Sequence, residues 1–229
     1  MVKKMNEGTM RLHEIMDSMF DVAQIDSRSL KPHLQPVDLG RLIHDVCVEQ
    51  SKTANEREQK ITIALPPLPQ VKADQNLLKK MFHHLIRNAI KFTPNGGKIT
   101  VIGNQIPPVI NLPNGGVEIT IIDTGVGVDP NLREIIFTKF YQPGELGKHS
   151  TSKSRFKGGG AGLGLALSKG IIEAHGGKIW VESPGYDEVN FPGSQFHIIL
   201  PLEKLENGQS HKVSEAVKYG IKNENEVRT

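Results

Sequence analysis

The sequence predicts an α/β protein: a two-layer sandwich in which helices cover one face of a mixed, mostly antiparallel sheet, preceded by one long helix. Two observations predict this fold class. Apolar residues recur at spacings of three and four in some segments and alternate in others, in the order helix, strand, helix, strand, strand, short helix, helix, strand, strand. Strands that follow each other directly favour antiparallel pairs, because a parallel pair needs a longer crossover.

The bulk composition excludes several classes of protein. Of 229 residues, 28 are Lys or Arg and 25 are Asp or Glu, so the formal net charge is 28 − 25 = +3 and we expect no nucleic-acid partner. The single cysteine, Cys47, cannot form an internal disulfide, which fits a reducing compartment. No apolar run approaches the ~20 residues that span a membrane, and no signal peptide opens the chain. We expect a cytoplasmic piece without a membrane segment, whose longer parent can still be membrane-anchored.

One long amphipathic helix is expected near the N-terminus. Its apolar stripe, at helical spacing, consists of Leu12, Ile15, Met16, Met19, Phe20 and Ala23. Because no helix precedes it, the stripe needs a partner from elsewhere, such as another chain. The prolines in residues 31–39 break the helix and predict a linker. Residues 1–33 are therefore assigned to this helix and the start of its linker.

The segments after residue 33 supply the sandwich. Asp38 is a candidate cap for a helix at 39–57, and Asp74 stands at the start of another at 75–93. Residues 66–74 are interpreted as a turn-rich connection. Strands are predicted at 60–65, 98–106, 116–123, 178–183 and 194–202, and further helices at 131–141 and 163–177. Residues 34–203 thus form the main domain, and residues 204–229, which lack an apolar stripe, form a polar tail.

The helix predicted at 75–93 carries a polar face beside its apolar one. His84, Asn88 and Lys91 share this face, because spacings of four and three align side chains on a helix. The amide oxygen of Asn88 is a hard ligand that suits Mg²⁺. Lys91 can meet phosphate as a point charge. Taken alone, the pattern is also compatible with a solvated helix face.

Two glycine-containing segments point to a bound nucleotide. In residues 123–127, DTGVG, the carboxylate of Asp123 can accept a hydrogen bond from an amine such as that of adenine, and the two glycines let backbone approach a flat ring. An ordinary strand-to-helix turn is the alternative. Residues 157–170, KGGGAGLGLALSKG, open a helix whose backbone amides can meet anionic oxygens. Neither a P-loop nor a dinucleotide fold fits, since these glycines follow a long loop.

The order and spacing of four stretches resemble the ATP-binding domain of sensor histidine kinases, in the superfamily that includes DNA gyrase, the heat-shock ATPase chaperones and mismatch-repair ATPases. RNAIKFTP resembles the N box, DTGVG the first glycine box, IFTKFYQ the F box, and GAGLGLALSKGIIEAHGGKIWVES the second glycine box and its continuation. The opening helix resembles the second helix of the dimerisation and histidine-phosphotransfer hairpin. The resemblance runs from about residue 11 to 202 and implies the Bergerat ATP-binding fold.

The resemblance implies ATP and Mg²⁺ as cofactors and a role for each matched residue. Asn88 would coordinate Mg²⁺, Lys91 would contact phosphate, and Phe92 would lie near the adenine. Asp123 would bind the adenine amine. Gly125 and Gly127 would shape the wall beside the adenine. The backbone amides of Gly162, Leu163 and Gly164 would contact the phosphates.

Residues 142–160 would form a lid over the nucleotide. Four basic residues lie in this segment: Lys148, Lys153, Arg155 and Lys157. They either cover the triphosphate and neutralise its negative charge, as phosphoryl transfer requires, or belong to a solvated basic loop.

Two departures from the family pattern bear on catalysis. The family usually carries an Asn one turn before Asn88, whereas this chain has His84, whose imidazole matches Mg²⁺ less well than an amide oxygen. His84 either weakens the metal site, acts through water or faces solvent. The phosphoacceptor histidine, which the family places on the first hairpin helix before an acidic residue and a proline, is not found. The nearest candidate, His13, lacks that proline and lies on the second helix.

The catalytic residue therefore stays unassigned. We expect a chain that begins after the acceptor helix, binds Mg-ATP and does not autophosphorylate efficiently by itself. The implied reaction is transfer of the γ-phosphoryl group to a histidine and then to an aspartate on a response-regulator receiver domain, within a homodimeric parent. Two alternatives stay open: a degenerate, nucleotide-gated interaction module without kinase activity, and an ATPase of the gyrase and chaperone type. The latter carries a catalytic glutamate where this chain has His84.

Overall fold

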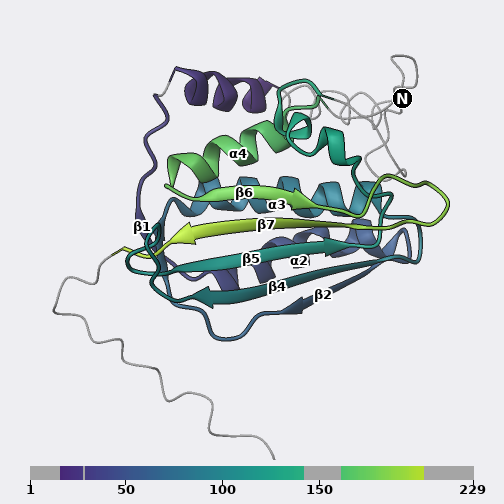
Figure 1. Cartoon of the computed structure of the whole chain (residues 1–229), viewed down its shortest axis with the longest axis horizontal. Helices are drawn as coiled ribbons and strands as arrows, with labels where there is room; N and C mark the ends of the chain where they lie inside the picture. Colours follow the sequence, from purple (N-terminus) through teal and green to yellow (C-terminus); the bar gives the residue numbers. More distant parts are fainter. Residues whose placement is uncertain (1–15, 28, 142–160, 204–229) are drawn as a thin grey trace, which may run out of the picture.

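The fold is organised around a five-stranded sheet (Figure 1). The computed structural model describes residues 16–27, 29–141 and 161–203. The strands lie in the order β2-β4-β5-β7-β6, with β2 and β4 parallel and the other neighbours antiparallel. Their bounds are β2 (Lys60–Ala64), β4 (Lys98–Ile106), β5 (Gly116–Asp123), β7 (Ser194–Pro201) and β6 (Lys178–Glu182). The predicted mixed, mostly antiparallel sheet is confirmed.

Three helices pack on one face of this sheet: α2 (Leu39–Asn55), α3 (Gln75–Phe92) and α4 (Gly164–Ala174). In Figure 1, α2 and α3 lie behind the strands. In β6 and β7 buried residues alternate with half-buried or exposed ones, so that one face meets the helices and the other is partly open to solvent; the central strand β5 is buried over most of its length. This arrangement is the two-layer sandwich that the sequence predicts.

The starts of α2 and α3 are capped by aspartates, as the sequence suggests. The carboxylate of Asp38 accepts a hydrogen bond from the backbone N–H of Arg41 at 3.0 Å. That of Asp74 accepts from Asn76 at 3.0 Å and Leu77 at 3.1 Å. Each carboxylate satisfies N–H groups that have no partner within the helix, which fixes where the helix begins.

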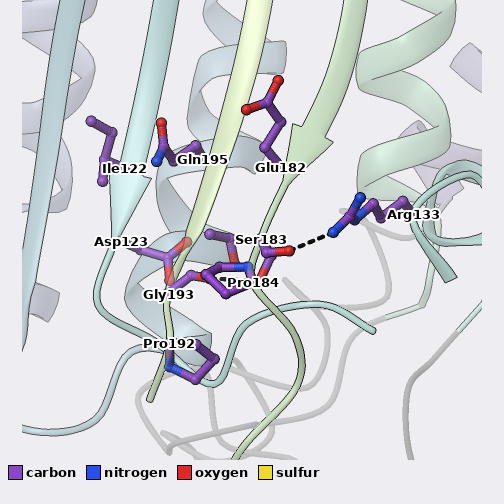
Figure 2. A pocket seen from close by; sticks show the side chains of 10 residues that line it. Ile122, Asp123, Arg133, Glu182, Ser183, Pro184, Pro192, Gly193 and Gln195 are labelled. Atoms are coloured by element: carbon purple, nitrogen blue, oxygen red, sulfur yellow. Dashed lines mark hydrogen bonds between the residues drawn. The ribbon is translucent and has the colours of Figure 1, made fainter. Parts of the chain in front are cut away.

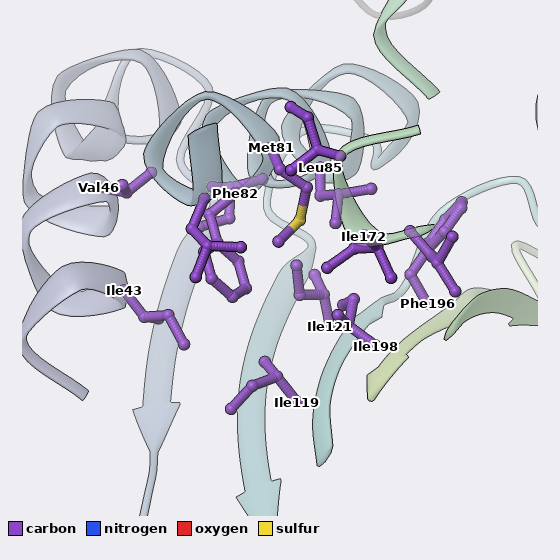
Figure 3. Packing of buried hydrophobic residues seen from close by; sticks show 14 of the residues in the cluster. Ile43, Val46, Met81, Phe82, Leu85, Ile119, Ile121, Ile172, Phe196 and Ile198 are labelled. Carbon is purple, nitrogen blue, oxygen red and sulfur yellow. The ribbon is translucent and has the colours of Figure 1, made fainter. Parts of the chain in front are cut away.

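The core lies between the helices and the sheet (Figure 3). Phe82 of α3 is fully buried at its centre. Other members of the cluster come from α2, α3, α4 and the strands β5 and β7: Ile43, Val46, Met81, Leu85, Ile119, Ile121, Ile172, Phe196 and Ile198. Cys47 is also buried, and burial raises the pKa of its thiol to about 11, so that it behaves as a small apolar residue.

Two short strands were missed by the sequence analysis. The segments interpreted as a linker and a turn-rich connection contain β1 (Gln35–Val37) and β3 (Val71–Ala73), which pair as a separate antiparallel sheet. Three residues are too few to show alternation, and Pro36 argues against a strand except at an edge. A two-stranded sheet has only edges, so the proline is tolerated there.

The helix predicted at 131–141 is wrong. The segment forms two 3₁₀ turns, η1 (Pro130–Leu132) and η2 (Ile135–Phe137), and then Phe140 adopts a left-handed φ of 61°. Phe137 is buried and meets Phe196 edge-on, with ring centroids 6.4 Å apart. The contact of Phe137 with the core therefore determines the backbone here, although the apolar residues have helical spacing.

The first helix, residues 16–26, packs on the domain beside α4 (purple in Figure 1). Val22 is buried, and the Lys80 ammonium lies 2.8 Å from the carboxylate of Asp21. Lys139 pairs with Asp26 in the same way. The predicted stripe faces away from the domain: Met16, Met19 and Phe20 are 59%, 50% and 65% exposed. The part of the stripe before residue 16 lies outside the described residues.

Replacing Gly170 with Leu should detach this helix. A Cβ at Gly170 would lie 2.6 Å from two side-chain carbons of Ile25, so a side chain as large as Leu takes the space in which Ile25 packs. We expect faster amide hydrogen exchange across residues 16–26 and unchanged exchange in β5. Lys169→Leu, which adds the same side chain at a half-exposed neighbour, is the control. Unchanged exchange in the first helix of the Gly170 variant would contradict the packing.

Candidate nucleotide-binding site

The polar face of α3 meets the start of α4. Asn88 and Lys91 are half-buried on this face, and the Lys91 ammonium lies 4.6 Å from the centroid of the Phe92 ring. One turn earlier, His84 lies against Gly164, where a Cβ would sit 3.2 Å from the imidazole Nδ1. Two segments that are 80 positions apart in the sequence are thus brought into contact.

Burial makes His84 a neutral side chain. Loss of water contact lowers the pKa of His84 to about 4; the neighbouring His83, Arg87 and Lys80 act in the same direction, and Asp21 opposes them. At pH 7 the imidazole therefore offers one N–H donor and one nitrogen acceptor, without charge.

The start of α4 presents a helix terminus without a side-chain cap. Leu163 occupies the cap position and is buried, and its side chain makes no capping hydrogen bond. The first N–H groups of a helix carry a partial positive charge and attract anions. Gly162 precedes them with a φ of 70°, and its carbonyl accepts the backbone N–H of Phe140 at 2.9 Å. The predicted lid, residues 142–160, lies outside the described residues.

Asp123 is buried where β5 ends. It is 4% exposed, and its carboxylate accepts the backbone N–H of Gly125 at 2.8 Å. Burial raises the pKa of Asp123 to about 6, although hydrogen bonds from Gly125 and Ser194 favour the charged form. Ser194 was missed by the sequence analysis; it is placed beside Asp123 by the register of β5 and β7, which no local pattern shows. A buried carboxylate of this kind is suited to a hydrogen-bond donor on a ligand.

The end of α3 is tied to the glycines after β5. The backbone N–H of Val126 donates to the carbonyl of Phe92 at 3.2 Å, and a Cβ at Gly125 would lie 2.5 Å from that same oxygen. Phe92, Asp123 and Gly125 therefore form one continuous wall. The structure brings the predicted adenine residues together, with Gly127 facing elsewhere.

Gly127 packs against the connection between β6 and β7. Its φ is 74°, and a Cβ there would lie 1.9 Å from the carbonyl oxygen of Gly185. We expect Gly127→Ala to lower the free energy of unfolding by about 2 kcal/mol or more, because left-handed backbone alone costs roughly 1–2 kcal/mol with a side chain. Chemical denaturation measures this loss. Gly185→Ala is the control, since nothing lies within 4 Å of its Cβ position, and an equal loss in both variants would contradict the clash.

A hollow of about 450 Å³ lies nearby, where β5 and β6 end and β7 begins (Figure 2). Arg133 crosses its rim, donating from Nη2 to the carbonyl of Ser183 at 2.6 Å. Its lining consists of Ile122, Asp123, Arg133, Glu182, Ser183, Pro184, Pro192, Gly193, Ser194 and Gln195. Asp123 is the one predicted site residue in this lining, so the hollow is not the predicted site.

Comparison with known proteins decides the family. Residues 73–204 match the family described as histidine kinase-, DNA gyrase B-, and HSP90-like ATPase. The chain belongs to this family. Its described helices include none long and apolar enough to cross a membrane.

The curated relatives are sensor kinases. The adaptive-response sensory kinase SasA of Prochlorococcus marinus subsp. pastoris is 33% identical over 200 residues, covering 86% of this chain and 49% of the relative. Hybrid signal transduction histidine kinase D of Dictyostelium discoideum is 31% identical over 192 residues, covering 83% and 12%. The chain thus spans half or less of the length of these relatives.

Solved structures agree. The mycobacterial sensor histidine kinase MprB is 28% identical with a TM-score of 0.58, covering 73% of this chain and 97% of that one. ShkA, solved in complex with AMPPNP, is 26% identical with a TM-score of 0.68, covering 87% and 38%. ThkA, crystallised with the response regulator TrrA, shares the fold at 23% identity and a TM-score of 0.59, covering 84% and 49%. The chain carries the ATP-binding catalytic domain of a histidine kinase, and the predicted fold class is confirmed.

Proposed function

We propose that this chain is the catalytic part of a sensor histidine kinase that binds Mg-ATP between α3 and the start of α4. The observation that carries the proposal is the contact between the polar face of α3 and the uncapped start of α4, together with the buried carboxylate of Asp123, which is linked through Gly125 to the end of α3. Positive helix-terminal amides and a Lys suit a triphosphate, and the buried acceptor suits the adenine amine.

Each side chain then has a defined task. Asp123 orients the adenine, and Gly125 and Phe92 form the wall beside it. The ammonium of Lys91 and the amides of Gly162, Leu163 and Gly164 hold the phosphates.

The metal would be held by Asn88 together with phosphate oxygens. An amide oxygen is a ligand that Mg²⁺ accepts, and a single protein ligand suits a metal carried by a nucleotide. The bound Mg²⁺ would neutralise charge that develops on the phosphates. Residues 1–33 are proposed to be the second hairpin helix and linker, residues 34–203 the ATP-binding domain, and residues 204–229 a polar tail.

The phosphoryl group would pass to a histidine on a hairpin helix outside this chain, and from there to a receiver domain. The ThkA–TrrA complex and the sensory-kinase relatives support a response regulator as partner. The exposed stripe of the first helix supports a homodimeric parent.

Two measurements test this function. Calorimetry should show Mg-dependent ATP binding by the chain alone. With [γ-³²P]ATP and a separately expressed acceptor hairpin of a sensory kinase, label should appear on the hairpin as acid-labile phosphate. ATP binding without phosphoryl transfer to any hairpin supports the nucleotide-gated module. That alternative is considered because His84 stands where the family usually carries Asn. Steady ADP release without an acceptor supports the gyrase-type ATPase.

A further inference from the structure

The C-terminal end of α3 lacks a donor that a helix end needs. In a continuing helix, the carbonyl of Ile90 would accept from the N–H of residue 94, but residue 94 is a proline and has none. Thr93 follows the last residue of α3, so its carbonyl has no hydrogen-bond donor within the helix, and Thr93 is fully buried. A buried carbonyl without a partner is costly, so these two oxygens need donors from another part of the chain.

Two side chains from the segment between α2 and β2 supply those donors. The guanidinium of Arg57 donates from Nη1 to the carbonyl of Ile90 and from Nη2 to that of Thr93, the latter at 2.7 Å. The side-chain amide of Gln59 reaches the same carbonyls, at 3.0 Å from Ile90 and 2.8 Å from Thr93. Both residues are buried, with 3% and 4% exposure.

Arg57 also holds the turn after α3. Its Nε donates to the side-chain oxygen of Asn95 at 3.1 Å, and its backbone carbonyl accepts the N–H of Gly96 at 3.0 Å. A cation at a helix C-terminus is further favoured by the helix dipole. The planar fork of a guanidinium can meet two carbonyls and a side chain at once, which an ammonium cannot do in a fixed geometry.

The end of α3 is also where the proposed site is built. Lys91 and Phe92 lie between the two clamped carbonyls, and Asn88 lies one turn earlier. The carbonyl of Phe92 in turn fixes Val126 at 3.2 Å, next to Gly125. A shift of the helix end would therefore change where Asn88 and Lys91 lie relative to the wall that follows Asp123.

We propose that Arg57 and Gln59 are positioning residues for nucleotide binding: their side chains clamp the end of α3 and thereby set the distance between α3 and the wall that follows Asp123. This inference rests on the proposed nucleotide site and adds two residues that touch no nucleotide. Neither lies in the four sequence boxes, and their contacts span more than 30 positions.

The test compares Mg-ATP affinity and folding stability in three variants. Arg57→Met removes the donors but keeps an apolar stem, and Gln59→Leu removes the amide without a change of charge. Leu200→Ala is a destabilised control, because Leu200 is buried in the core and pairs with Val117, at the end of β5 opposite Asp123. All affinities are measured at a temperature where each variant is folded.

We expect the Kd for Mg-ATP to rise about tenfold in Arg57→Met and by a smaller factor in Gln59→Leu, in line with the loss of hydrogen bonds from a charged and a neutral donor. Leu200→Ala should lose stability but keep its affinity. Hydrogen exchange at the Val126 amide should accelerate in the two clamp variants and not in the control. Arg57→Lys should recover the affinity only partly.

The outcomes separate the two proposals. If the unaltered chain does not bind Mg-ATP, the proposed function fails. If it binds and Arg57→Met binds equally well, or if Leu200→Ala loses affinity in proportion to its stability, the clamp has no positioning role. Should Arg57→Met fail to fold, Gln59→Leu gives the same decision through its affinity and its Val126 exchange rate.

Discussion

Asp123→Asn is expected to cost the protein most of its affinity for ATP while stabilising the free protein at neutral pH. Loss of a hydrogen bond from the adenine amine to a charged acceptor weakens binding by roughly 10- to 100-fold. Asn keeps an oxygen for the Gly125 N–H, so the local backbone should be retained. Calorimetry measures the affinity and chemical denaturation measures the stability.

The stability change has a defined pH dependence. Because burial raises the pKa of Asp123 from 3.8 to about 6, the folded state binds its proton more tightly than the unfolded state. The stability that this tighter proton binding gives the folded state is fully present below about pH 4 and is lost as the pH rises through 6. The pKa of Asp123 differs by about two between the unfolded and folded states, and a pKa difference of one corresponds to about 1.36 kcal/mol, so the free energy of unfolding falls by about 2–3 kcal/mol. Asp123→Asn should flatten the stability profile in this range.

The affinity for ATP should change with pH in the opposite sense. A carboxylate accepts the adenine amine better when it is ionised, so the ratio of wild-type to Asp123→Asn affinity should rise between pH 5 and 7. The ratio cancels the titration of the nucleotide itself. Asp45→Asn, the same change of charge on an exposed part of α2, should alter neither profile. Equal pH dependence in wild type and Asp123→Asn would exclude Asp123 from the site.

Long periodic segments made most of the fold predictable. The helical spacing of apolar residues in α3 and the alternation in β5 and β7 extend over enough residues to define both the element and its buried face. The two caps, Asp38 and Asp74, marked the helix starts. β1 and β3 were not predictable in this way, because each has three residues and their stability comes from pairing with each other.

The candidate site was predictable where its residues are close in sequence. Asn88 and Lys91 follow from helix spacing, and Asp123 and Gly125 from their position after a strand. The clamp by Arg57 and Gln59 joins segments more than 30 positions apart, through contacts to backbone oxygens that any residue possesses. One signal was present: a proline directly after the end of a helix leaves a carbonyl that some other group must satisfy.

The second large effect is expected in the Mg²⁺ dependence of ATP binding. Asn88→Ala should abolish the advantage of Mg-ATP over metal-free ATP, because it removes the one amide oxygen that this face of α3 offers to the ion. The measured quantity is the ratio of the Kd without Mg²⁺ to the Kd with it. We expect the ratio to fall by about tenfold or more, towards 1, as for loss of a metal-supporting group. A ratio that does not change would place the metal elsewhere.

His84→Asn should act in the other direction and completes the argument about the departure from the family pattern. An amide oxygen suits Mg²⁺ better than an imidazole nitrogen, so a second Asn one turn before Asn88 should raise the ratio. The smaller side chain also fits, since His84 already lies in contact with Gly164. His83→Asn, on the neighbouring position whose ring meets the amide of Gln50 at 2.6 Å, is the control. A rise confined to His84→Asn shows a metal site that histidine weakens. If the ratio does not rise in His84→Asn but still falls in Asn88→Ala, one amide oxygen suffices for the metal.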